Sequence, residues 1–140
     1  MEEVAAGCYQ VVKSIQFTFQ LFYLTGSYSE PLGLENGHIS SEAITASSEL
    51  DDKHSASRAR LNSKPEGELM GSWVPLQSDE NQWLQVDLRK ILEVTKVSIQ
   101  GGGDGVSMYV TSFILLYSED GETFQDYREN NAEKVRNICM

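Results

Sequence analysis

Short runs in which apolar and polar residues alternate constrain the fold of this chain most strongly. Residues 83–88 and 95–100 both alternate in this way, which is typical of half-buried strands. Residues 110–117 carry apolar side chains on both faces, which indicates a strand covered on both sides. Because no window shows a sustained helical period, the sequence predicts an all-β sandwich or barrel.

Turn residues separate these runs. Asp120-Gly121 lies between residues 110–117 and 123–127, and this dipeptide supplies the positive φ that a tight hairpin needs. The glycine-rich residues 101–105 predict a loop by composition alone. We therefore expect a hairpin at Asp120 and a loop that follows residue 100.

The acidic balance narrows the classes of partner. The 140 residues include 21 acidic and 11 basic side chains, and the net charge is −10. Nucleic-acid phosphates need clustered Lys and Arg, so no nucleic-acid partner is expected. The same balance weakens the case for an anionic membrane. Cys8 and Cys139 allow at most one disulfide, which excludes a disulfide-rich scaffold and a four-thiolate zinc site.

Residues 1–30 differ from the rest of the chain in their pattern of apolar and polar residues. Polar residues interrupt the apolar run of residues 11–24, so it does not predict a transmembrane helix. The acidic start, Met1-Glu2-Glu3, has the wrong sign for a signal peptide. Residues 15–23 alternate as a strand does. We expect residues 1–30 to be a poorly defined leader or the remnant of a preceding segment.

Beyond residue 30, the chain carries a series of short motifs, which are Pro31–Ile39, Ile44–Ser48, Ser57–Asn62, Gly71–Trp73, Asn81–Leu88, Val94–Val97, Ile99–Gly101, Tyr109–Phe113 and Tyr117–Gly121. In this order and spacing, they resemble the discoidin domain, also called the coagulation factor 5/8 type C domain. The resemblance implies a jelly-roll-like β-sandwich of the galactose-binding-like type. It also implies an extracellular binding module, of the kind found in adhesion proteins, receptors and clotting cofactors. Family ligands are phospholipid head groups, galactose-type sugars, collagen or protein termini.

The chain departs from the family pattern at both ends. The family usually has a Cys shortly before the Pro-Leu-Gly turn and another after its last strand. Here residues 27–29 are Ser-Tyr-Ser, and the chain stops at Met140, where the family continues. We therefore expect residues 31–140 to form a discoidin domain that is incomplete at its C-terminus, with its last strands missing.

By resemblance, two segments correspond to protruding loops at one end of the sandwich. Their apolar residues are flanked by acids, which disfavours binding to phosphatidylserine because burying a carboxylate in a membrane surface is costly. Asp51 and Asp52 are also weak candidates for calcium ligation. The predicted ligand-binding residues are Leu50, Asp51, Asp52, Lys53 and His54 in one loop, and Asp104, Val106 and Met108 in the other.

Four further residues are expected to be structural. Trp73 and Trp83 fit core packing better than a sugar-stacking platform, because they lie in framework motifs. Arg60 and Asp87 are expected to form a charge-assisted pair that fixes a loop to a strand.

No catalytic constellation emerges, since a nucleophile needs a positioned base and His38 and His54 both lie in the N-terminal half. The sequence therefore predicts a non-catalytic, extracellular or cell-surface module for adhesion to a glycan or protein, with no cofactor other than the calcium considered above. Two alternatives stay open. They are binding to a phospholipid surface and a role as the auxiliary carbohydrate-binding module of a larger enzyme.

Overall fold

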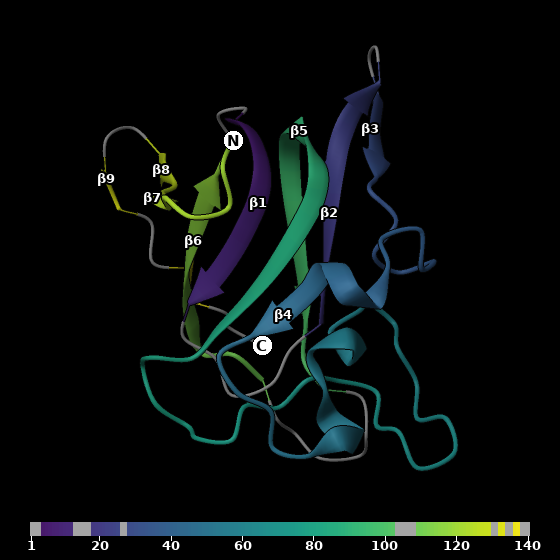
Figure 1. Ribbon diagram of the computed structural model, residues 1–140. Coiled ribbons are helices and arrows are strands. Elements are labelled where there is room, and N and C mark those ends of the chain that lie inside the picture. Colours follow the sequence, from purple (N-terminus) through teal and green to yellow (C-terminus); the bar gives the residue numbers. More distant parts are fainter. Residues whose placement is uncertain are drawn as a thin grey trace.

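One long strand, β5 (Trp83–Gln100), organises the fold. The computed structural model describes residues 4–12, 18–25, 28–102, 109–129, 132–133 and 136–137. Apart from single-turn 3₁₀ helices, the regular structure of these residues is antiparallel strands, which confirms the predicted all-β class (Figure 1). The other elements are β1 (Val4–Val12), β2 (Thr18–Thr25), β3 (Tyr28–Pro31), η1 (Ser41–Ala43), β4 (Ile44–Ala46), η2 (Asp52–His54), η3 (Ala56–Arg58), β6 (Ser112–Ser118), β7 (Gln125–Asp126), β8 (Arg128–Glu129), β9 (Ala132–Glu133) and β10 (Arg136–Asn137).

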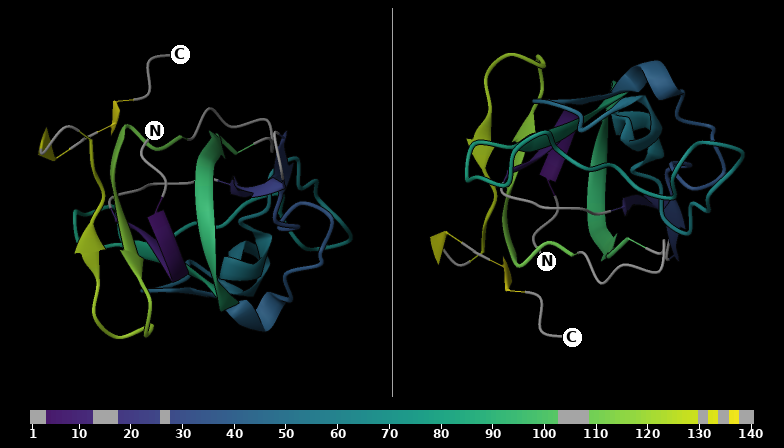
Figure 2. Two further views of the ribbon diagram at one scale, coloured as in Figure 1. Left: turned by 90° about the horizontal axis from the view of Figure 1, so that it is seen from above. Right: turned by 90° about the horizontal axis from the view of Figure 1, so that it is seen from below.

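The main sheet has the strand order β10-β6-β1-β5-β2-β3, with β4 paired to β5 and β7 paired to β6. Seen from above and from below, β1 and β5 lie between β6 on one side and β2 and β3 on the other (Figure 2). β8 and β9 pair separately as a two-stranded sheet. This topology places β5 at the centre of the hydrogen-bonded network.

A bend divides β5 into two halves. The first half pairs with β4 and β1, and the second half pairs with β2 and with the start of β1. Arg89 has a φ of 59°, an uncommon conformation for a residue with a side chain. The Asp87 carboxylate accepts a hydrogen bond from the Arg89 backbone N–H at 2.7 Å and holds the bend locally. The fold-over of β5 lies at the end of the molecule away from η2 and η3 (Figure 1).

The buried core follows the predicted alternation. Leu84, Val86 and Leu88 are buried, whereas Gln85 and Asp87 are partly exposed. Each large apolar side chain contributes about 1.5–3 kcal/mol when fully buried. The buried cluster also contains Leu34, Ile44, Ala56, Ala59, Trp73, Val94, Val110 and Phe113.

The hairpin predicted at Asp120 is present. β6 and β7 pair antiparallel, and Gly121 between them has a φ of 77°. The Asp120 carboxylate accepts hydrogen bonds from the backbone N–H groups of Glu122 at 2.8 Å and Thr123 at 2.7 Å. These bonds to the ionised form hold the pKa of Asp120 far below its usual range.

The strands described within the first thirty residues are paired with the body of the chain. Cys8–Val12 of β1 pair with Trp83–Asp87, and Thr18–Tyr23 of β2 pair with β5 between Val94 and Gln100. The strand predicted from the alternation at residues 15–23 thus overlaps β2. The sequence did not indicate that both strands lie beside β5, and the domain boundary at residue 30 stays a prediction. No helix in the described part of the chain is long and apolar enough to cross a membrane.

Two positions on β5 test whether burial or local propensity stabilises the fold. Leu84→Ala should lower the free energy of unfolding by about 2–5 kcal/mol, because Leu84 is fully buried and truncation leaves a cavity. The matched control Ile91→Ala should cost less than about 1 kcal/mol, because Ile91 is 57% exposed on the same strand. Urea denaturation measures both variants. Equal losses would contradict the assignment of the core face.

Candidate binding loops

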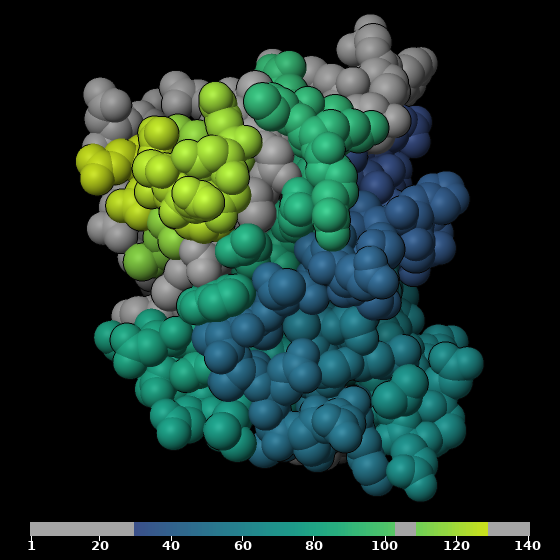
Figure 3. All heavy atoms as spheres, in the orientation of Figure 1, coloured from purple at the N-terminus to yellow at the C-terminus, as the bar shows by residue number. Residues whose placement is uncertain are grey.

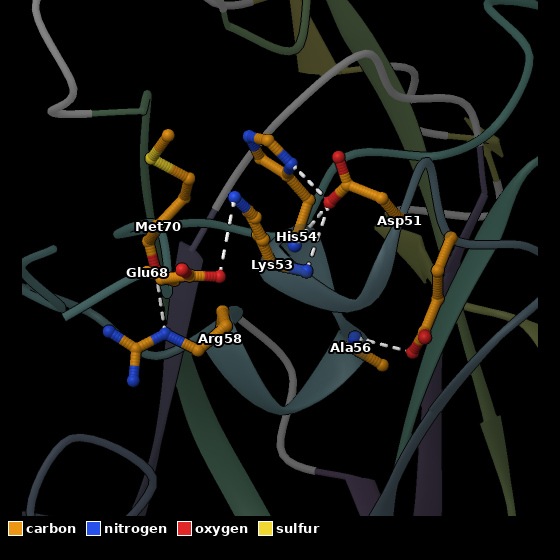
Figure 4. Close-up of polar contacts among 8 residues, drawn as sticks. Asp51, Lys53, His54, Ala56, Arg58, Glu68 and Met70 are labelled. Atoms are coloured by element: carbon orange, nitrogen blue, oxygen red, sulfur yellow. Dashed lines mark hydrogen bonds and ion pairs between the residues drawn. The ribbon is translucent and has the colours of Figure 1, made fainter. Parts of the chain in front are cut away.

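The loop around η2 is ordered by one carboxylate. Asp51 Oδ1 accepts hydrogen bonds from the backbone N–H groups of Lys53 and His54, each at 3.0 Å, and lies 2.7 Å from His54 Nδ1 (Figure 4). Asp51 therefore caps the start of η2, where aspartate is one of the preferred residues. The hydrogen bond with the His54 side chain is the largest cause that lowers the pKa of Asp51 below its ordinary value.

Backbone hydrogen bonds fasten this loop to the segment before β5. Leu50 N–H donates to Val74 O at 2.8 Å, and Val74 N–H donates to His54 O at 3.2 Å. Met70 N–H donates to Lys53 O at 2.9 Å. The loop thus has a backbone that hydrogen bonds hold in place. In the space-filling view, η1 to η3 and the segment that follows them cover the lower part of the visible face (Figure 3).

Trp73 joins the loop to the buried core. Its side chain is fully buried, and its indole Nε1–H donates to Ser48 O at 2.9 Å. Trp83 is partly buried at the start of β5. Ser48 Oγ and Ser47 Oγ both donate to Gln82 Oε1, at 2.6 and 2.9 Å. This network ties the chain entering the loop to the chain entering β5.

The predicted loop residues divide into two groups. The His54 side chain is only 15% exposed, and the Asp51 side chain is 47% exposed but its Oδ1 is used within the loop, so both position the backbone. Leu50, Asp52 and Lys53 are exposed. Lys53 Nζ lies 3.6 Å from Glu68 Oε2, and both side chains are open to solvent (Figure 4). Leu50, Asp52 and Lys53 are therefore the groups that this loop offers to a ligand.

Two apolar residues that sequence reasoning missed lie on the segments bound to this loop. Leu69 is 40% exposed and Leu76 is 58% exposed. Leu76 N–H donates to Ser48 Oγ at 3.1 Å, and Leu69 immediately precedes Met70, which bonds to Lys53. The available signal was an isolated leucine within a polar stretch, as in residues 76–81. Such leucines are common in loops, so the pattern alone did not single them out.

The second predicted loop lies outside the described residues. Asp104, Val106 and Met108 all fall in residues 103–108, so their place relative to Leu50 stays a prediction.

Arg60 and Asp87 do not form the expected pair. Arg60 donates to Leu34 O at 2.6 Å, to Ser57 O at 3.1 Å and to Ser41 Oγ at 3.3 Å. Asp87 Oδ2 instead pairs with Arg89 Nε at 3.1 Å. The prediction of this pair was wrong because the backbone bend at Arg89 brings a nearer cation to Asp87, while Arg60 is directed to backbone carbonyls. Both residues nevertheless make structural contacts.

The Asp51 and Asp52 carboxylates do not constitute a formed calcium site. Calcium takes six to eight oxygen ligands, and Asp51 Oδ1 already accepts hydrogen bonds from three N–H donors. Among the described residues, no group of three or more His, Cys, Asp and Glu side chains is arranged to hold a metal ion.

These features define an antiparallel β domain with a hydrogen-bonded loop cluster at one end. A sequence profile of the F5/8 type C domain matches residues 43–138. The chain therefore belongs to the F5/8 type C, or discoidin, domain family, and its fold is the β-sandwich of that family.

Curated relatives agree with this assignment. The chain is 38% identical over 109 residues to coagulation factor V of Sus scrofa, covering 74% of this chain and 5% of that protein. It is 39% identical over 116 residues to coagulation factor VIII of Canis lupus familiaris, covering 78% of this chain and 5% of that protein. It is 36% identical over 113 residues to EGF-like repeat and discoidin I-like domain-containing protein 3 of Homo sapiens, covering 76% of this chain and 23% of that protein. No solved structure matches the chain significantly.

The hydrogen bond between Asp51 and His54 can be tested by titration. In His54→Ala the pKa of Asp51 should rise toward its ordinary value, because the largest cause of its depression is removed. Since the folded-state pKa is lowered, the stabilisation from ionised Asp51 is present above the unfolded-state pKa. It is lost as the pH falls below about 4 and through the folded-state pKa. Carboxyl carbon NMR measures the titration directly.

Asp79 is the internal control for this titration. Its pKa is lowered chiefly by the Gln82 side-chain amide, which donates to Asp79 Oδ1 at 2.8 Å. The Asp79 midpoint should be the same in wild type and His54→Ala. An unchanged Asp51 midpoint would show that the imidazole does not contribute to the cap.

Proposed function

We propose that this chain is a non-catalytic extracellular or cell-surface module that recognises a glycan or protein surface through the loop at residues 49–56. The observation that carries the proposal is the internal hydrogen bonding of Asp51, which fixes the backbone while leaving Leu50, Asp52 and Lys53 exposed. Loops on a rigid scaffold are favoured positions for recognition. The family membership supports a binding role.

The recognition mechanism is preorganisation. A ligand that meets an already ordered loop avoids the entropy cost of fixing it, about 0.5–1.5 kcal/mol for each immobilised flexible side chain. Ala56 N–H donates to Glu49 Oε1 at 2.7 Å, so the far end of the loop is fastened as well. Leu50 then supplies apolar contact, and Asp52 and Lys53 supply polar contacts that select the ligand.

The chain spans about 5% of the length of the coagulation factors it matches and 23% of the EGF-like relative. We propose that the module is one part of such a longer architecture. As an auxiliary carbohydrate-binding module of a larger enzyme, it would use the same loop.

The proposal can be tested on an array of glycans and matrix proteins, read with and without calcium. The double variant Leu50→Ser/Asp52→Asn should bind its targets about tenfold more weakly or worse, a loss equivalent to about 1.4 kcal/mol. Neither side chain holds the loop together, so the fold should be retained, which thermal melting verifies. Lys90→Gln/Ile91→Ser, at the bend of β5, is the matched control and should bind as wild type does. Unchanged binding by the loop variant would refute the assignment.

Binding to a phospholipid surface is a second candidate, favoured by one observation. Leu50, Leu69 and Leu76 are exposed on three segments that hydrogen bonds join at the loop end of the molecule. Apolar tips of this kind can enter the interface of a bilayer. Asp51, Asp52 and Glu68 lie on the same segments and oppose an anionic surface.

Vesicle sedimentation decides between these candidates. If the leucines insert, wild type should sediment with neutral phosphatidylcholine vesicles, and Leu69→Ser/Leu76→Ser should sediment at least about tenfold less at the same lipid concentration. Ile91→Ser, an exposed apolar residue at the bend of β5, is the control that should still sediment. Absence of sedimentation by wild type with these neutral vesicles would rule out insertion of the leucines, because such a surface does not repel the acidic residues of the loop.

A further inference from the structure

A basic crevice lies beside the binding loop, on the side of η3. It has a volume of about 550 Å³, and Arg58, Arg60 and Lys64 all line it. Arg58 extends from η3 away from Asp51 and His54, so the crevice is separate from the Asp51 cap (Figure 4). In a chain with a net charge of −10, three cations on one small surface form a local exception to the overall charge.

The Arg58 guanidinium is fixed by backbone carbonyls rather than by a carboxylate. Its Nε–H donates to Met70 O and its Nη2 donates to Lys64 O, each at 2.6 Å. It forms no ion pair with any carboxylate in the described part of the chain. Nη1 and one N–H of Nη2 stay available, so the group is oriented while its charge is not neutralised.

Arg60 is held in the same way. Its acceptors in the described part of the chain are the carbonyls of Leu34 and Ser57 and the hydroxyl of Ser41, none of which carries a charge. Burial, and then repulsion from the nearby Arg58 charge, lower the pKa of Arg60. An anion between the two guanidinium groups would offset both effects, because it supplies the missing negative charge.

The acidic groups of the crevice only partly offset this charge. Glu35 and Glu66 also line it, so three cationic side chains face two anionic ones. Glu35 Oε1 accepts a hydrogen bond from Asn62 Nδ2 at 2.7 Å, which directs that carboxylate toward an amide. Lys64 is exposed, and its ammonium group makes no hydrogen bond or ion pair to another residue that the structure describes.

We propose that this crevice is an oxyanion site that takes a sulfate or carboxylate group. Guanidinium groups with fixed orientation favour such oxygens because they donate in a planar fork. If the module binds glycans, as proposed above, the anion is a substituent of an acidic glycan, and the inference on its source rests on that proposed function. In that case the crevice binds the anionic substituent, and the neighbouring loop contacts the rest of the glycan.

The first experiment tests the crevice itself, using inorganic sulfate on the full chain. Titration with sodium sulfate against sodium chloride at equal ionic strength should shift the Nε–H signals of Arg58 and Arg60 in a saturable way. Arg89, which is already paired with Asp87, is the internal control and should not respond to sulfate specifically. The absence of a sulfate-specific shift at Arg58 and Arg60, or an equal shift at Arg89, would overturn the oxyanion site.

The second experiment tests the source of the anion, with a sulfated oligosaccharide and its desulfated counterpart. Lys64→Gln should weaken binding of the sulfated form about tenfold and leave the desulfated form unchanged. Lys64→Gln is the primary variant because the Lys64 side chain holds no loop contact, and Arg58→Gln should follow it if thermal melting shows a retained fold. Lys90→Gln is the control of equal charge change and should bind as wild type does.

The outcomes separate the two proposals. If both oligosaccharides bind equally and Lys64→Gln has no effect, the assignment of the anion to a glycan substituent is overturned while glycan recognition stands. If inorganic sulfate shifts the two arginines but neither oligosaccharide binds, the oxyanion site stands and glycan recognition is overturned.

Discussion

The burial of one face of β5 is the constraint on which the rest of the structure depends. Leu84 and Val86 are fully buried in the same apolar cluster as Trp73 and Leu34. Because side chains alternate along a strand, a shift of one residue would move this whole set to the opposite face. β1 and β4 both pair with the same half of β5, so its register also sets where the segments around them lie.

Local hydrogen bonds, together with this buried core, order the binding loop. Trp73 connects the core to the loop, because its ring belongs to the buried cluster while its indole N–H donates to Ser48 O at the entrance of the loop. Asp51 and Glu49 then fix the two ends of the short turn that follows. The residues that order the loop are consequently different from Leu50, Asp52 and Lys53, which face solvent.

The charged side chains also differ in whether local contacts use their charge. The carboxylates of Asp51, Asp79 and Asp120 are used locally, as acceptors for nearby N–H or O–H groups in turns. Arg58 and Arg60 are held by neutral oxygens, so their charges stay available even though acids outnumber bases in the chain. Net charge describes long-range attraction, whereas recognition depends on which charges are left uncompensated at one place.

The sequence by itself determined the strand alternation of residues 83–88, the hairpin at Asp120 and the family motifs. These features depend on neighbours a few residues apart, where periodicity and turn geometry act. It also located the loop that contains Leu50 and Asp51. Tertiary structure alone decided that Arg60 binds Leu34 O rather than Asp87, that His54 is largely covered, and that Leu69 and Leu76 join the loop end. Those contacts join segments that lie far apart in the sequence, and they depend on how these segments pack together in three dimensions, which no local pattern encodes.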